Sequence, residues 1–284
     1  MTNTKSLTEE LKQAFIELIA YQTGLDIKHR EKTDFVEKIF SRMKALKLSL
    51  PEHYYHFLES ATIESFKEWR KLVILLTNTD SYFFRDQGQF NVLRNHIFPE
   101  IIKRKQLNKT IRLCSAGCAT GEEPYSLAIL LREIIPNIEE WKIMIFGLDI
   151  NQAALNKAQT GIYTSWSFRN SPAEIIQRYF LLINDHYLID REIKQMVKFI
   201  NFNLVKDPLP QFGFQLRDMD LIICRNVFIY FDVGAIAKVL DKFYHTLQPL
   251  GYLLTGHTEL SSQNLNKFQT KVFPESLIYQ RPLK

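Results

Sequence analysis

The sequence predicts an α/β protein in which an all-helical domain precedes a largely parallel sheet with helices on both faces. Apolar residues recur at helical spacing from about Thr8 to Leu76. From about Gln89 onward, short apolar runs that fit strands alternate with helical patterns, which is typical of a parallel sheet. The chain has 284 residues, 46% of them apolar, and is therefore long enough to bury two cores.

Residues 1–76 are predicted as the helical domain. Pro51 can open a helix and Gly24 can close one. The segment TNTDSYFFRD then breaks the helical pattern, so residues 77–88 are predicted as a connector to the second domain. The helical spacing itself is carried by apolar positions that include Leu11, Phe15, Phe35, Ile39, Phe57, Phe66, Trp69 and Val73.

Residues 89–284 are predicted as the α/β domain. Its helices are expected over Glu122 to Ile134, Asn151 to Gln159 and Gly234 to Leu247. The piece from Arg178 to Phe199 does not fit the rhythm of strands and helices and is predicted as a small inserted sheet. The strands are expected at IRLCSAG, KIMIFGLDI, KFINFN, MDLIICRN and GYLLTGH, with a closing antiparallel pair at KFQTKVF and ESLIYQR.

Composition and charge exclude several classes of protein. A net charge of +5 is too small, and the basic residues too dispersed, for a dedicated nucleic-acid binder. Three cysteines without a CxxC pair predict neither a disulfide framework nor a zinc site, and His53 and His56 lack a third metal ligand. The N-terminus lacks the apolar core of a signal peptide, and no run of about 18 apolar residues is present. We therefore expect a soluble cytoplasmic protein without a metal or membrane insertion.

The residues that follow the predicted strands indicate a ligand site, because ligands of parallel sheets bind at the carboxyl ends of the strands. Gly117 and Gly121 in SAGCATGEEPYS allow close approach of the backbone, and Glu122 and Glu123 begin the next helix. Asp149 ends the next strand, where a carboxylate can accept hydrogen bonds from ribose hydroxyls. CRN and GHTE follow two further strands.

The charges at this edge favour one class of nucleoside. A pyrophosphate would be repelled by the two acids in the first helical turn, whereas a ligand with positive charge would not. S-adenosylmethionine, with its sulfonium and ammonium groups, is the common nucleoside of that kind. Two simpler interpretations stay open: Glu122 and Glu123 could only cap the helix, and Asp149 could be an ordinary turn residue.

Five segments together resemble a known family. SYFFRD, SAGCATGEEPYS, GLDINQAALNKAQTGIY, ICRNVFIYFD and GHTE occur in the order found in chemoreceptor glutamate methyltransferases of the CheR type. The resemblance covers nearly the whole chain. It implies a Rossmann-like S-adenosylmethionine-dependent methyltransferase domain with a small inserted antiparallel β subdomain at about residues 178–200. It also implies methyl transfer to glutamates on the cytoplasmic helical bundle of chemoreceptors, with S-adenosylhomocysteine as the second product.

The resemblance also implies which residues bind the cofactor and face the methyl group. Arg85 and Tyr230 correspond to residues that face the transferred methyl. Thr79 and Ser81 depart from the family's usual Asn and Thr, and Asn78 is a possible substitute for the missing amide. The residues that correspond to cofactor contacts are Thr79, Ser81, Arg85, Glu123, Asp149, Asn203, Leu204, Arg225 and Asn226.

The chemistry of a glutamate acceptor limits what the active site must do. A glutamate side chain is ionised at neutral pH, so it needs no general base. An arginine clamped on that carboxylate would stabilise the charged ground state more than the transition state. We therefore assign Arg85 a positioning and cofactor-binding role, and Tyr230 the orientation of the carboxylate or methyl group. A surface salt bridge for Arg85 and a packing role for Tyr230 are the alternatives.

The helical domain is predicted to recognise the substrate. Between Lys28 and Lys47 there are seven basic residues against three acidic ones, and receptor methylation helices are acidic. The docking face is predicted at Lys38, Arg42, Lys44 and Lys47, with an ordinary solvated helix face as the alternative.

The loop LLINDHYLIDRE is shorter than in relatives that capture a receptor C-terminal peptide, and it has no glycine, so independence of such a tether is expected. Two other functions stay open: methyl transfer to an acceptor outside chemotaxis, and non-catalytic signalling through S-adenosylmethionine binding.

Overall fold

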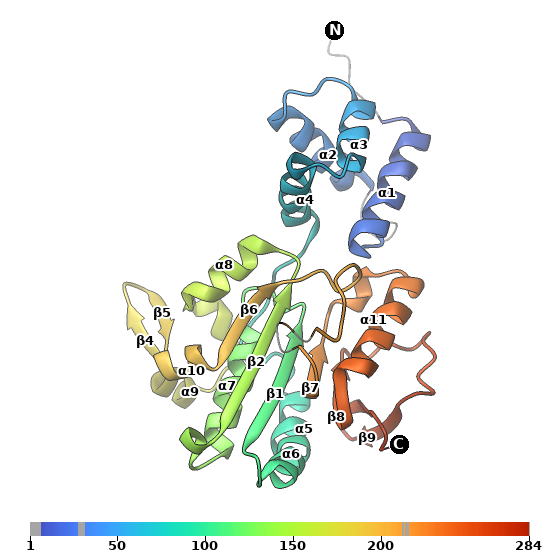
Figure 1. Cartoon of the computed structure of the whole chain (residues 1–284). Helices are drawn as coiled ribbons and strands as arrows, with labels where there is room; N and C mark the ends of the chain where they lie inside the picture. Colours follow the sequence, from blue (N-terminus) through green and yellow to red (C-terminus); the bar gives the residue numbers. More distant parts are fainter. Residues whose placement is uncertain (1–6, 28–31, 212, 214–215, 284) are drawn as a thin grey trace.

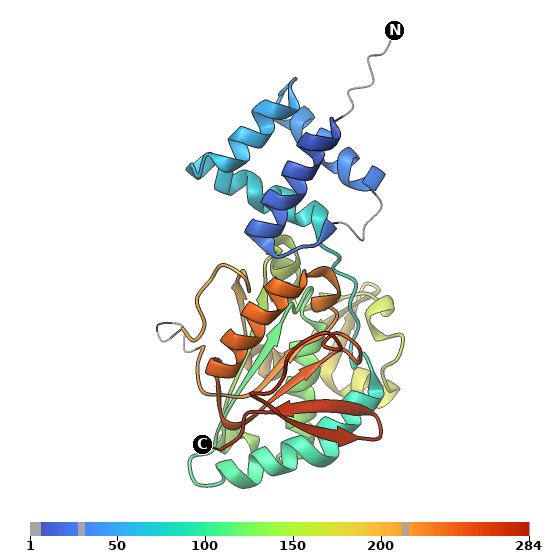
Figure 2. The ribbon, with the colours of Figure 1, turned by 90° about the vertical axis from the view of Figure 1, so that its right-hand side faces the viewer.

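In the computed structural model, a helical domain lies against one end of an α/β domain (Figure 1). The structure describes residues 7–27, 32–211, 213 and 216–283. Figure 2 shows the helical domain at one end of the molecule and the C-terminus near the other. The predicted α/β class, with a preceding helical region and a small separate sheet, is confirmed.

Four helices form the N-terminal region: α1 (Glu9–Thr23), α2 (Lys32–Ala45), α3 (Pro51–Glu59) and α4 (Ile63–Leu76). The side chains of Thr8 and Thr62 cap the first turns of α1 and α4 by accepting backbone N–H groups. Gly24 ends α1 in the left-handed conformation, with φ of 78°, and Pro51 begins α3. Both helix boundaries predicted from Gly24 and Pro51 are confirmed.

A buried ion pair joins the helices of this region. The Nε and Nη2 atoms of Arg42 on α2 each donate to the Glu68 carboxylate on α4, both at 2.7 Å. The Tyr54 hydroxyl on α3 donates to the same carboxylate at 2.9 Å, and burial together with this carboxylate raises the pKa of Tyr54. The Glu68 side chain is only 2% exposed, so the charge of Arg42 is neutralised by a carboxylate inside the domain.

The α/β domain contains a seven-stranded sheet in the order β6-β2-β1-β7-β8-β10-β9. The five strands from β6 to β8 are parallel, and β10 and β9 close the sheet in antiparallel fashion. All the predicted strands occur. Their bounds are β1 (Thr110–Ala116), β2 (Lys142–Asp149), β6 (Val197–Asn201), β7 (Met219–Cys224), β8 (Leu247–Thr255), β9 (Gln269–Phe273) and β10 (Ser276–Gln280).

Helices cover the two faces of the sheet and create two cores. Alternate residues along β1 point to opposite faces, so Leu113 belongs to one cluster and Cys114 to the other. One face is covered by α7 (Glu122–Ile134) and by the helical run α5 (Gln87–Val92), η2 (Leu93–Ile97) and α6 (Phe98–Lys105), and the other by α11 (Val233–Thr246). The helix α8 (Gln152–Thr160) packs near the edge strand β6.

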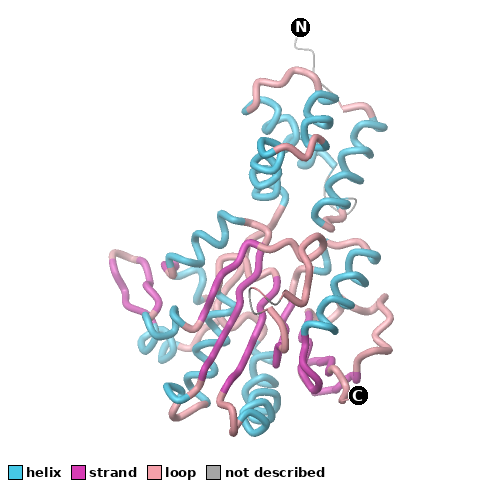
Figure 3. Tube along the Cα trace, viewed as in Figure 1, coloured by secondary structure: helices cyan, strands magenta, loops and turns pink. Residues whose placement is uncertain are grey.

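A second, three-stranded antiparallel sheet stands apart from the first (Figure 3). Its order is β3 (Ile162–Tyr163), β5 (His186–Ile189) and β4 (Phe180–Ile183). The hairpin between β4 and β5 turns at Asn184 and Asp185, both with positive φ, which suits a two-residue turn. The remaining short elements of this domain include η3 (Ile138–Glu140), η4 (Ser165–Phe168), α9 (Ala173–Tyr179) and α10 (Arg191–Gln195).

The helical domain is attached to the α/β domain by more than the connector. The backbone N–H of Asp26 donates to the Tyr230 carbonyl at 2.6 Å, and Leu25 and Phe231 form an isolated antiparallel bridge. A side chain at position 24 would also meet Val205 at 2.5 Å, so glycine permits this close approach. The end of α1 is therefore fixed on the α/β domain.

The Arg42 and Glu68 pair generates a prediction about stability. Glu68→Gln leaves the partly buried Arg42 guanidinium without its counter-charge, so we expect a loss of about 2 kcal/mol in the free energy of unfolding. Glu64→Gln, on the exposed side of the same helix, is the matched control and should change stability by less than about 0.5 kcal/mol. Urea unfolding measures both, and equal effects of the two variants would contradict a structural role for the pair.

Candidate functional site

A pocket lies between the helical domain and the carboxyl ends of β1, β2 and β7. It encloses about 630 Å³, including its open mouth. Six segments line it: the end of α1, the start of the connector, the turn after β1, the end of β2, the segment after β6 and the segment after β7. The lining residues are Thr23, Leu25, Thr77, Asn78, Gly117, Ala119, Asp149, Ile150, Phe202, Asn203, Leu204, Asn226, Val227, Tyr230 and Phe231.

The turn from β1 to α7 presents backbone to this pocket. Gly117 has φ of 76°, and a Cβ atom there would lie 2.2 Å from a methyl group of Val227. Its N–H donates to the Leu148 carbonyl at 2.7 Å, which fixes the turn against β2. Gly121 precedes α7 with φ of 92°, so both glycines predicted for close approach are needed by the fold.

Asp149 lies at the pocket with its carboxylate already oriented. One oxygen accepts the backbone N–H of Ala119 at 2.8 Å, and the other accepts that of Asn151 at 2.7 Å. Each carboxylate oxygen has a second lone pair, so the group can still accept two hydroxyls of a ligand. Burial raises the pKa of Asp149, while these N–H donors oppose the rise.

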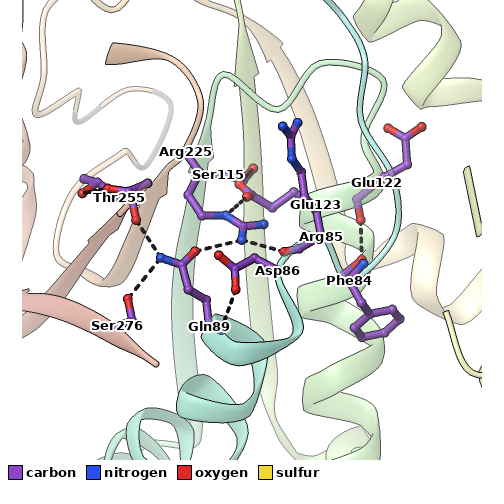
Figure 4. A network of polar contacts seen from close by, with 12 residues as sticks. Phe84, Arg85, Asp86, Gln89, Ser115, Glu122, Glu123, Arg225, Thr255 and Ser276 are labelled. Atoms are coloured by element: carbon purple, nitrogen blue, oxygen red, sulfur yellow. Dashed lines mark hydrogen bonds and ion pairs between the residues drawn. The ribbon is translucent and has the colours of Figure 1, made fainter. Parts of the chain in front are cut away.

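Arg225 and Glu123 form an ion pair behind the pocket (Figure 4). The Arg225 Nε donates to Glu123 at 2.7 Å, and its Nη1 donates to the Arg85 carbonyl at 2.7 Å and to the Gln89 side chain at 2.9 Å. Ser115 donates to the same glutamate at 2.7 Å. Because Arg225 is only 8% exposed, this network fixes the backbone around the site.

The connector is held in place by the two residues that precede Arg85. The N–H of Phe83 donates to the Ser167 carbonyl, and the N–H of Phe84 donates to the Ser126 hydroxyl at 3.0 Å. The guanidinium of Arg85 donates to the Asp80 carbonyl at 3.3 Å, and in Figure 4 it points away from the Arg225 guanidinium. Arg85 therefore has a fixed backbone and a half-buried side chain.

Glu259 organises the segment after β7. Its carboxylate accepts the N–H of Gly256 at 2.6 Å and that of Ile229 at 3.4 Å, and the N–H groups of Asn226 and Val227 also face it. Burial raises the pKa of Glu259, and these donors oppose the rise. The segment that wraps around this carboxylate includes η5 (Phe228–Tyr230) and supplies Asn226, Val227 and Tyr230 to the pocket lining.

Asn226 presents an uncommitted amide to the pocket. Its φ of 58° is in the left-handed region, which asparagine tolerates better than most residues. Its side chain makes no hydrogen bond to any residue that the structure describes, although the residue lines the pocket wall. Such an amide is available to a ligand.

The residues predicted to bind the cofactor or face the methyl group fall into two groups. Asp149, Asn203, Leu204, Asn226 and Tyr230 line the pocket, whereas Thr79, Ser81, Arg85, Glu123 and Arg225 are not among its lining residues.

The amide of Asn203 is largely used by the fold. Its Nδ2 donates to the Gln22 carbonyl at 2.7 Å, and its Oδ1 accepts the Val205 N–H. In the connector, Thr77 and Asn78 reach the pocket instead of Thr79. The Asn78 amide accepts the N–H of Asp80 at 2.9 Å, so it shapes the connector that Thr79 belongs to.

The predicted docking face on α2 is partly committed to internal pairs. Lys38 pairs with Asp34 at 2.6 Å, and Arg42 is held by Glu68 as described above. Lys44 and Lys47 are exposed. Since two of the four cations are matched, the unpaired positive charge of α2 is smaller than its sequence indicates.

Besides lining residues such as Thr23, Leu25 and Phe202, the sequence interpretation missed residues that hold the site in place. Glu259 lies in GHTE, a segment that was noted as a strand end, so its position was the available signal. Gln89 and Ser115 complete the network around Arg225, but one is on α5 and the other within β1. No spacing in the sequence relates these two to position 225. His257 bonds to Asp86 at 2.6 Å and does not line the pocket.

Comparisons with known proteins give matches over most of the chain. Residues 79–276 match the family model described as CheR methyltransferase, SAM binding domain. The chain is 32% identical over 265 residues to chemotaxis protein methyltransferase 2 of Vibrio cholerae, covering 93% of this chain and 90% of that protein. It is 31% identical to a chemotaxis protein methyltransferase of Borreliella burgdorferi, covering 92% of each. The corresponding protein of Escherichia coli is 29% identical, with 94% of this chain and 90% of that protein covered.

The geometry of Asp149 generates a prediction about cofactor binding. Asp149→Asn removes the charge and one acceptor oxygen, so we expect affinity for S-adenosylhomocysteine to fall by about tenfold or more. In the unaltered protein the affinity should fall as the pH is lowered from about 7 toward the pKa of Asp149, which burial raises above its usual value, because protonation removes an acceptor. Calorimetric titration across this pH range measures both effects. A variant whose affinity equals that of the unaltered protein would contradict the assignment.

Proposed function

The chain belongs to the CheR methyltransferase family, and from this premise we propose that the pocket under the helical domain is its active site. The protein is a chemotaxis protein methyltransferase that uses S-adenosylmethionine and methylates chemoreceptor glutamates. The observation that carries the proposal is the meeting of Asp149, Asn226 and Tyr230 in one pocket at the carboxyl edge of the sheet.

The residues present fit this cofactor. The Asp149 carboxylate has free lone pairs for two ribose hydroxyls, and the backbone at Gly117 can approach a ligand closely. Phe202 and Leu204 add apolar surface to the same pocket, which suits a flat base. The cofactor supplies an electrophilic methyl group on a positively charged sulfur. Asn226 offers it an amide that nothing else in the described chain uses.

The chain has little proton chemistry to perform. The acceptor is a carboxylate that is ionised at neutral pH, so no side chain has to act as a general base. The carboxylate and the sulfonium neutralise one another as the methyl is transferred, so a site that excludes water favours the reaction. The remaining contribution is alignment, which is worth up to about 7 to 11 kcal/mol when reactants are held in position.

Tyr230 and Arg85 are assigned positioning roles. Tyr230 lines the pocket next to Asn226, at the junction with the helical domain, where it can orient the incoming carboxylate or the methyl group. Arg85 is held near the site through its carbonyl, and its guanidinium lies within 5.6 Å of the Tyr82 ring. An arginine that does not clamp the reacting carboxylate avoids stabilising the ground state.

The proposal includes the location of the reaction and its independence of a receptor tether. We place the reaction in the cytoplasm, where the helical bundle of the receptors lies. In the part of the chain that the structure describes, no helix has the length and apolar character that a membrane span requires. The two-residue turn at Asn184 and Asp185 leaves no extended loop beside the small sheet, which supports independence of a receptor tether peptide.

Methyl transfer to receptors is the direct test of the proposed function. With methyl-labelled S-adenosylmethionine and membranes that hold the host's chemoreceptors, we expect base-labile label on a receptor-sized band, because carboxyl methyl esters hydrolyse in alkali. Asp149→Ala, which removes the ribose acceptor, should lose the label at low cofactor concentration and serves as the control. Cofactor binding without any labelled receptor would instead favour another acceptor or a signalling role.

Tether independence is tested with a peptide. A receptor C-terminal peptide should show no binding at concentrations of about 100 µM, because the small sheet lacks the longer loop expected of peptide-capturing members. Isothermal titration measures this, and micromolar affinity would overturn the prediction.

A further inference from the structure

The helix α4 exposes large apolar side chains on its outer face. Ile63, Phe66 and Ile74 are 69%, 59% and 38% exposed. Helical spacing alone grouped Phe66 with the core positions, but the inward face of α4 is formed by Ser65, Glu68, Leu72, Val73 and Leu76. Large apolar residues that recur on one exposed helix face are typical of a surface that contacts a partner.

The same face carries positive charge that nothing in the described chain neutralises. Lys67, Arg70 and Lys71 are exposed, and their side chains make no ion pair or hydrogen bond to any described residue. Glu64 is the one exposed acid on this helix. On α2, by contrast, Lys38 and Arg42 are matched by carboxylates. Among the described side chains of these two helices, the unmatched positive charge is therefore concentrated on α4 more than on α2.

These residues form one continuous stripe. Ile63, Phe66, Lys67, Arg70 and Ile74 follow the spacing i, i+3, i+4, i+7 and i+11, which places them on one side of a helix. The stripe is about 16 Å long at 1.5 Å per residue. It ends three residues before Thr77, which lines the pocket. A ligand lying along the stripe therefore reaches the mouth of the active site.

Resting on the proposed function, we propose that this stripe on α4 docks the acidic helix of the receptor that carries the glutamate to be methylated. The occupant must be helical, negatively charged and partly apolar, because the stripe alternates large apolar groups with cations over three turns. A methylation helix has this chemistry, since its acceptor residues are glutamates. The cations would steer it by charge, and Phe66 would supply the central apolar contact.

The test compares charge reversals at α4 with matched reversals elsewhere, using the full chain and receptor membranes. Lys67→Glu with Arg70→Glu, and separately Phe66→Ser, should each raise KM for receptor by about tenfold, which corresponds to 1.4 kcal/mol. The turnover number and the affinity for S-adenosylhomocysteine should stay within about twofold, because neither variant touches the pocket. Circular dichroism and thermal unfolding establish that the variants are folded, as expected for exposed positions.

Lys103→Glu with Arg191→Glu is the matched control. It changes the net charge by the same amount on two exposed residues of α6 and α10, and KM should stay within about twofold of the unaltered protein. A KM that stays unchanged in the α4 variants overturns the inference. So does a larger rise in Lys44→Glu with Lys47→Glu, which would place docking on α2. If the unaltered protein labels no receptor at all, the proposed function fails instead.

Discussion

The buried pair of Arg225 and Glu123 is the interaction on which the rest of the site depends. Removing two charges from water is costly, and here the cost is offset because Ser115, Gln89 and the Arg85 carbonyl satisfy the remaining hydrogen-bonding groups. The pair joins the residue after β7 to the first turn of α7, and its hydrogen-bond partners link it to β1, the connector and α5. It therefore sets the positions of groups that line the pocket without itself forming the wall.

Some residues of the site could be predicted from the sequence and others could not. Asp149 and Asn226 could be predicted because both follow parallel strands, whose carboxyl ends meet at one edge. The roles of Glu123 and Arg225 could not be inferred from position, since a side chain that begins a helix or follows a strand can point into a pocket or behind it. Only the structure shows that these two satisfy each other.

In the helical region, the sequence predicts where helices begin and end better than it predicts which side of each helix is buried. Pro51 and Gly24 are local signals, and both helix ends were predicted correctly. Arg42 and Glu68 are 26 residues apart, so no spacing rule relates them, and Arg42 was interpreted as a surface cation. Phe66 fits the apolar period of α4 yet faces outward. Periodicity identifies an apolar helix face, but it does not determine whether a residue at the edge of that face is covered by another helix.

The pocket lies at the junction between the domains and is lined by residues of both. Thr23 and Leu25 come from the end of α1, while the opposite wall comes from the sheet. The Asp26 N–H donates to the Tyr230 carbonyl, and the Asn203 amide donates to the Gln22 carbonyl, so hydrogen bonds cross this junction. A ligand in the pocket contacts both domains and therefore favours the arrangement in which they are docked. A substrate bound to the helical domain that alters this docked arrangement would change the affinity for the cofactor. Thermodynamic reciprocity then requires that the cofactor change the affinity for the substrate by the same factor.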